Sequence, residues 1–71
     1  MLLRDFLLQT EISQSKMAGA IGVQRRSVRD YIDSGATVVI DWKDECGRVV
    51  TASGLEKHFL LSSLPGPHRV I

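Results

Sequence analysis

Three arginines lie close together in the stretch QRRSVRD, which covers residues 24–30. If this stretch is helical, four candidate side chains lie at its start or on its outward side: Gln24, Arg25, Arg26 and Arg29. An arginine side chain can donate two hydrogen bonds to the major-groove acceptors of guanine. Asp30 can accept a hydrogen bond from cytosine, or it can hold Arg26 by an i, i+4 ion pair. The chemistry that this stretch predicts is contact with the edges of bases in DNA.

The surrounding sequence, from Gln14 to Ile32, predicts two short helices joined by a tight turn. Apolar residues recur there three and four positions apart, so each helix presents one apolar stripe to the interior. These residues are Met17, Ala18 and Ile21 in the first helix and Val28, Tyr31 and Ile32 in the second. Gly22 falls at the turn, where glycine adopts a positive φ at little cost. This spacing is typical of a helix-turn-helix, whose second helix enters the major groove.

Basic charge is concentrated in the same stretch. Residues 14–32 carry Lys16 and three arginines against one aspartate, a net charge of +3, whereas the whole chain has a net charge of +1. Ser13 is a candidate N-cap for the first helix, and the amides at a helix N-terminus favour phosphate. Gln14, Ser15 and Lys16 open that helix and are the predicted contacts to the DNA backbone. The alternative is an ordinary helical pair with a solvated basic face.

The length and composition limit the architecture. At 71 residues, the chain predicts a single domain, residues 1–71, with a small core. Cys46 is the only cysteine, which excludes an intrachain disulfide and favours a reducing cytoplasm. His58 and His68 lack the spaced partners of a metal site, so no metal or other cofactor is expected. Because neither a disulfide nor a metal site stabilises so small a core, we expect a homodimer to supply additional buried surface.

Several functional classes find no support in the sequence. It offers no nucleophile–base pair, carboxylate pair, phosphate-binding loop or metal-ligand set, so we expect neither an enzyme nor a small-molecule substrate. The apolar run at residues 1–8 is interrupted by Arg4 and Asp5 and is too short to span a bilayer, so no membrane partner is expected. We assign residues 2–9 instead to an amphipathic helix that covers the helical pair.

The helical part is expected to span residues 2–35, and the patterning changes after it. The last helix runs from about Arg25 to Asp33, and Gly35 is well placed as its left-handed C-terminal cap. Residues 36–53 predict a β-hairpin, because they are rich in β-branched residues. Helices followed by a hairpin place the chain in the α+β class.

The hairpin and the segment after it have predicted boundaries. The first strand is predicted over residues 36–42, with Val38, Ile40 and Trp42 on one face. The turn is predicted over residues 43–47, which include Cys46. The second strand is predicted over residues 48–53. Residues 54–71 form a C-terminal dimerisation segment or tail. Within it, the leucine spacing predicts a short helix over residues 54–63, which Pro65 ends, and an extended tail over residues 64–71.

The subunit contact is predicted in the second strand and the residues after it. Val49 and Val50 are adjacent, so both faces of this strand carry an apolar side chain, and the outer face or the strand edge needs cover. Antiparallel pairing of the strand with its mate covers the edge, while Leu55 and Phe59 fill the partner's core. The predicted interface residues are Val49, Val50, Leu55 and Phe59.

The order of a short helix, a helix-turn-helix and a hairpin resembles the Cro repressor of phage lambda and its relatives. The run GVQRRSVRDYIDSG, residues 22–35, aligns without a gap with the recognition helix and glycine cap of that family, with identity at Gly22, Val23, Ile32 and Gly35. Gln14, Lys16 and Ala18 match a glutamine, a lysine and an alanine, and Gly47 falls near the glycine of the hairpin turn. The resemblance covers residues 2–53. Asp30 departs from it, because lambda Cro has a lysine there, so the operator sequence does not carry over.

The resemblance implies a phage or prophage transcriptional repressor in the cytoplasm of a bacterial host, which binds a palindromic operator in double-stranded DNA as a homodimer. By this resemblance Arg25, Arg26, Arg29 and Asp30 fall on or beside base-contacting positions, and Gln14 falls on a backbone-contacting one. The leucine-rich C-terminal half departs from the short, basic tail of lambda Cro. It keeps open an alternative from another class, an interaction module that binds another regulator, as an anti-activator does.

Overall fold

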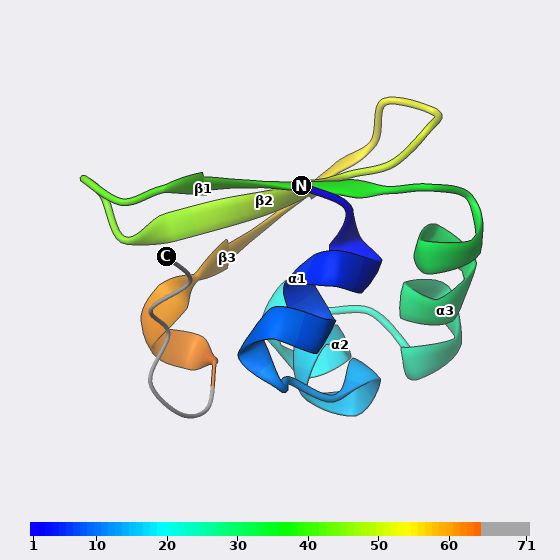
Figure 1. The fold of residues 1–71 in the computed structure, drawn as a ribbon, viewed down its shortest axis with the longest axis horizontal. Coiled ribbons are helices and arrows are strands. Elements are labelled where there is room, and N and C mark those ends of the chain that lie inside the picture. The colour runs from blue at the N-terminus through cyan, green and yellow to red at the C-terminus, as the bar shows by residue number, and fades with distance from the viewer. Residues whose placement is uncertain (65–71) are drawn as a thin grey trace.

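The computed structural model describes residues 1–64, and the tail predicted beyond Leu64 lies outside the described residues. The elements are α1 (Leu3–Thr10), α2 (Gln14–Ile21), α3 (Arg25–Asp33), β1 (Thr37–Asp41), β2 (Cys46–Val50), β3 (Glu56–Leu60) and the 3-10 helix η1 (Leu61–Ser63). Figure 1 shows the three helices on one side of a three-stranded antiparallel sheet with strand order β1-β2-β3. This arrangement confirms the predicted α+β class. The predicted hairpin is extended by a third strand.

Helix α3 has the bounds predicted from the sequence, and its C-terminal cap is a Schellman motif. The N–H of Gly35 donates to the carbonyl oxygen of Ile32 at 3.1 Å, and the N–H of Ala36 donates to that of Tyr31 at 2.9 Å. Gly35 has a φ of 82°, which is the left-handed conformation that this cap requires. The cap turns the chain from α3 directly into β1, and so fixes where the sheet starts relative to α3.

The core lies between the helices and one face of the sheet. Its buried side chains include Leu3 and Phe6 of α1, Met17 and Ala18 of α2, Val28 of α3, and Val38, Val49 and Phe59 of the sheet. Register pairs Val38 with Val49 and Gly47 with Phe59, so these residues share the face that meets the helices. The rings of Phe6 and Phe59 lie 6.2 Å apart between centroids, which connects α1 to β3.

The predicted hairpin is present, but its turn ends two residues earlier than expected. The Asp41 carboxylate accepts hydrogen bonds from the N–H groups of Lys43 and Asp44, and Glu45 adopts a φ of 53°. The turn is therefore completed before Gly47, and the second strand begins at Cys46 rather than at residue 48. Two predictions are wrong as a result. Cys46 lies in β2 rather than in the turn, and Trp42 lies in the turn, 52% exposed, rather than in the first strand on one face with Val38 and Ile40.

The prediction of a helix over residues 54–63 is also wrong, because half of this segment forms a strand. Glu56–Leu60 forms β3, which pairs antiparallel with the free side of β2, and only Leu61–Ser63 is helical, as a short 3-10 turn. In the strand, Phe59 points into the core and is 4% exposed. The strand conformation of this segment is explained by the burial of the Phe59 ring, which pairing with β2 makes possible. The spacing of the leucines indicated a helix instead.

The third strand overturns the predicted subunit contact. Strand β2 has β1 on one side and β3 on the other, so it has no free edge with which to pair with a mate. Val49 and Phe59 are buried in the core of the same chain, which leaves neither side chain available to a partner. Val50 is half-buried on the outer face of β2, and Leu55 is 47% exposed in the connection between β2 and β3.

Candidate nucleic-acid interface

Helices α2 and α3 pack against each other, and each contributes a buried side chain. Ala18 of α2 is 4% exposed and Val28 of α3 is fully buried, which lets the two helices approach closely. Between them Gly22 adopts a φ of 72°, and the N–H of Val23 donates to the carbonyl oxygen of Ala18 at 3.0 Å. The predicted turn at Gly22 is confirmed. The turn determines how the start of α3 is placed beside the start of α2.

The N-terminus of α2 is capped as the sequence predicts. The Ser13 side-chain oxygen accepts a hydrogen bond from the N–H of Lys16 at 3.1 Å. The amides of Gln14 and Ser15 precede that capped position and have no intrahelical acceptor. Exposed amides at a helix start carry a partial positive charge, which favours an anionic group such as a phosphate.

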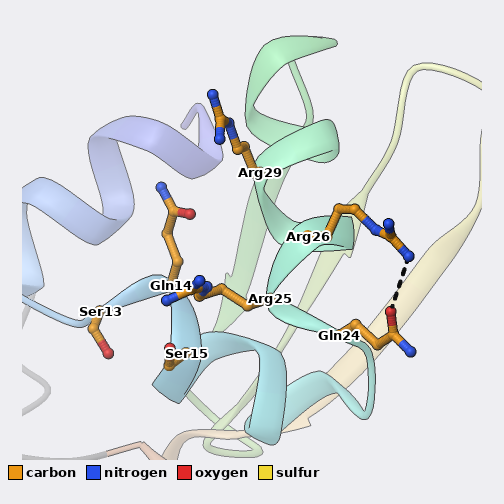
Figure 2. Close-up of a pocket in the computed structure, with 7 residues that line it drawn as sticks. All are labelled: Ser13, Gln14, Ser15, Gln24, Arg25, Arg26 and Arg29. Atoms are coloured by element: carbon orange, nitrogen blue, oxygen red, sulfur yellow. Dashed lines mark hydrogen bonds between the residues drawn. The ribbon is translucent and has the colours of Figure 1, made fainter.

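The starts of α2 and α3 enclose one hollow on the surface (Figure 2). The residues that line it are Ser13, Gln14 and Ser15 from α2 and its cap, and Gln24, Arg25, Arg26 and Arg29 from α3 and its cap. Gln24 and the three arginines are exposed, so their guanidinium and amide groups are accessible to a ligand. The fold therefore brings together six of the eight residues predicted to contact DNA. Lys16 and Asp30 are exposed but do not line this hollow.

The side chains of α3 lie in two directions around the hollow. Figure 2 shows Arg25 pointing toward Gln14, whereas Arg26 and Gln24 point away from that pair. The Arg26 guanidinium donates to the Gln24 side-chain oxygen at 3.5 Å, which is a long and exposed hydrogen bond. An i, i+4 ion pair between Asp30 and Arg26 is not formed among residues 1–64, so Asp30 leaves the arginine charge uncompensated.

The hollow has an uncompensated positive charge. Among residues 1–64, ion pairs join only Arg4 to Asp5 and Arg48 to Glu56, and both lie outside the helix-turn-helix. The side chains of Arg25, Arg26 and Arg29 therefore keep all their donors for a ligand, apart from the weak contact to Gln24. Several arginine forks without carboxylate partners suit a polyanion that presents many oxygen and nitrogen acceptors.

One lining residue was predicted only as a cap. Ser13 contributes to the hollow as well as closing the start of α2, and its position directly before a predicted helix start was the available signal. For Gly19, on the exposed side of α2, no atom of the described chain beyond its neighbours and the backbone of its own helix lies within 4 Å of the place a Cβ would occupy. The presence of glycine at this position is therefore not explained by close approach of another helix within residues 1–64.

Comparison of the chain with known protein families, with curated proteins and with solved structures finds no match. Within the part of the chain that the structure describes, no helix has the length and apolar character needed to cross a membrane. The function therefore has to be argued from the hollow and the elements that form it.

Proposed function

We propose that this protein is a sequence-specific DNA-binding transcriptional repressor of Cro type, which places α3 in the major groove of its operator. The observation that carries the proposal is the set of three exposed arginines on α3, which line one hollow together with the N-terminus of α2 and have no acidic partner in residues 1–64. In a helix-turn-helix, these two helix starts are the parts that meet the DNA.

The two halves of the hollow suit different parts of the duplex. Arg25 and Arg26 occupy the first turn of α3, where side chains of a recognition helix reach base edges. Gln14 and Ser15 supply exposed amides and side-chain donors at the start of α2, which suit a phosphate of the backbone. The base contacts provide sequence preference, and the backbone contacts fix the register of the protein on the DNA.

A homodimer follows from the size of the contact. One helix of this length covers only about four or five base pairs, which is too few to select one operator from a genome. Two α3 helices related by a twofold axis, about 34 Å apart, would contact two half-sites on one face of the duplex. The proposed operator is therefore palindromic.

Selection of bound sequences from random duplex DNA tests the proposal. We expect enrichment of a motif with two inverted half-sites, and an affinity that falls steeply with salt concentration because basic side chains displace counterions from phosphates. Equal affinity for all sequences, or an affinity that salt leaves unchanged, contradicts the proposal.

An interaction module that binds another regulator is the alternative from a different class. Its support was the apolar C-terminal half, but the structure uses Phe59, Leu61 and Leu64 to complete the core of the same chain. No enrichment of any DNA sequence at low salt would favour this alternative over the repressor.

A further inference from the structure

Gln24 and Arg26 are joined through their side chains, which a regular helix would keep apart. Residues two positions apart in a helix do not face each other. Gln24 is the N-cap of α3 and has an extended backbone, with φ −78° and ψ 153°, so its side chain is not bound by helical geometry. The Arg26 guanidinium donates to the Gln24 side-chain oxygen at 3.5 Å, which Figure 2 marks with a dashed line. Two of the side chains that line the hollow are therefore coupled to each other.

This hydrogen bond determines which groups the two side chains present to a ligand. Arginine has only donors, so the Gln24 atom next to it has to be the carbonyl oxygen, and the NH2 group lies on the far side (Figure 2). Gln24 makes no side-chain cap hydrogen bond to the start of α3, so its oxygen is not committed to the helix amides. The pair therefore presents donors only, namely the NH2 group of Gln24 and the remaining N–H groups of Arg26.

The coupling changes which base suits Gln24. A glutamine that is free in the major groove suits adenine, because its oxygen accepts from the N6 amino group while its NH2 group donates to N7. With Arg26 attached to that oxygen, an amino group in the same place would meet the cationic donors of the guanidinium. Guanine presents O6 and N7 at the major-groove edge and thymine presents O4, and all three atoms are acceptors. A donor-only pair therefore suits guanine or thymine better than adenine.

We propose that Gln24 and Arg26 act as one donor-only unit, which selects guanine at the Arg26 position and guanine or thymine at the Gln24 position beside it. The bonded atoms lie 3.5 Å apart, close to the spacing of about 3.4 Å between stacked bases, so the two side chains suit neighbouring bases. The bond is exposed in the free protein, and exclusion of water from the groove strengthens a hydrogen bond with a charged donor. This inference rests on the proposed function and names the class of base at one position of each half-site.

Selection of bound sequences with the parent and matched variants tests the unit. Gln24→Ala identifies the Gln24 position as the one at which base preference is lost. Arg26→Ala releases the Gln24 oxygen, so the preference there should change from guanine or thymine to adenine, while the preference at the neighbouring Arg26 position is lost. Arg29→Ala is the matched control, because it removes the same charge from α3 but no bond to Gln24, and it should leave the Gln24 position unchanged. Arg26→Lys should also leave it unchanged, because lysine has only donors and can hold the same oxygen.

Competition between duplexes that differ only at the Gln24 position gives the size of the effect. We expect the parent to bind the guanine or thymine duplex roughly five- to tenfold more tightly than the adenine duplex, and Arg26→Ala to reverse that order. A selected motif that keeps its preference at this position in Arg26→Ala overturns the unit, as does an equal change in Arg29→Ala, and in both cases the proposed function stands. Absence of any selected motif overturns the proposed function and this inference with it.

Discussion

Substitution of Gly47 by alanine tests how closely β3 packs on β2. Gly47 lies in β2 opposite Phe59, and a Cβ built on it would come within 2.6 Å of Phe59 Cζ and 2.9 Å of Ile40 Cδ1. Contacts below 3.0 Å require something to move. The Ile40 methyl is the end of a flexible side chain, but the Phe59 ring is buried and packs against Phe6. The ring therefore has little room to yield.

The expected cost is the difference of two effects. Overpacking of a core by one methyl group costs about 1–3 kcal/mol, and replacement of glycine by alanine returns about 0.4–1 kcal/mol through the entropy of the unfolded chain. Gly47→Ala should therefore lower the free energy of unfolding by roughly 1–2 kcal/mol. For a domain of this size, that corresponds to a fall in Tm of about 5–15 °C.

Urea and thermal denaturation of two matched variants complete the test. Gly19→Ala adds the same methyl group to open space on α2 and should raise the stability by up to about 1 kcal/mol. In a Phe59→Leu background, which removes the ring atoms that the new Cβ would meet, Gly47→Ala should cost little or nothing further. If Gly47→Ala melts like the parent, or costs the same in both backgrounds, the packing of β3 described above is incorrect.

Three further substitutions test the helix-turn-helix. Ala18→Lys should unfold the domain, because it places a charge in the crossing of α2 and α3; a far-ultraviolet circular dichroism spectrum like that of the parent would contradict this packing. Arg26→Ala should relax base preference at one position of each half-site and cost about 1–3 kcal/mol of binding; an unchanged selected motif would show that α3 is placed incorrectly. Gln14→Ala should weaken binding to all duplexes equally, as measured by titration of matched and scrambled sequences, because a backbone contact carries no base information; a change in motif would make Gln14 a base-contacting residue.

The helices of this protein could be predicted from the sequence because their signals are local. The start of α2 is marked by the Ser13 cap, its end by Gly22, and the end of α3 by Gly35, and each of these residues acts through the backbone within a few positions. The periodic apolar residues of the two helices then define one buried side for each. Because Gln24 and the arginines lie on the opposite side of α3, the local pattern was enough to place most of the candidate site on one surface.

The role of Gly47 depended on a contact that is distant in the sequence. The sequence suggested that Gly47 was needed for the turn, since glycine is common in turns. Asp41 and Glu45 complete the turn without it, and Gly47 is needed where the Phe59 ring covers the backbone of β2. The role of a glycine that makes room for a ring twelve positions away could not be recognised from its neighbours.

The third strand and the free edge of the sheet were decided by the tertiary structure. Residues 56–60 have only two side chains directed toward the helices, Lys57 and Phe59, so alternation over so short a run gives little evidence for a strand. Their strand conformation comes from pairing with β2 and from burial of Phe59 beside Phe6, both of which require distant parts of the chain to be in place. The same pairing covers β2 and exposes the edge of β3. Helix signals act within a few residues, whereas strand pairing brings together separate segments. For this reason α2 and α3 could be predicted from the sequence, while the three-dimensional fold decided which edge of the sheet has no strand partner within residues 1–64.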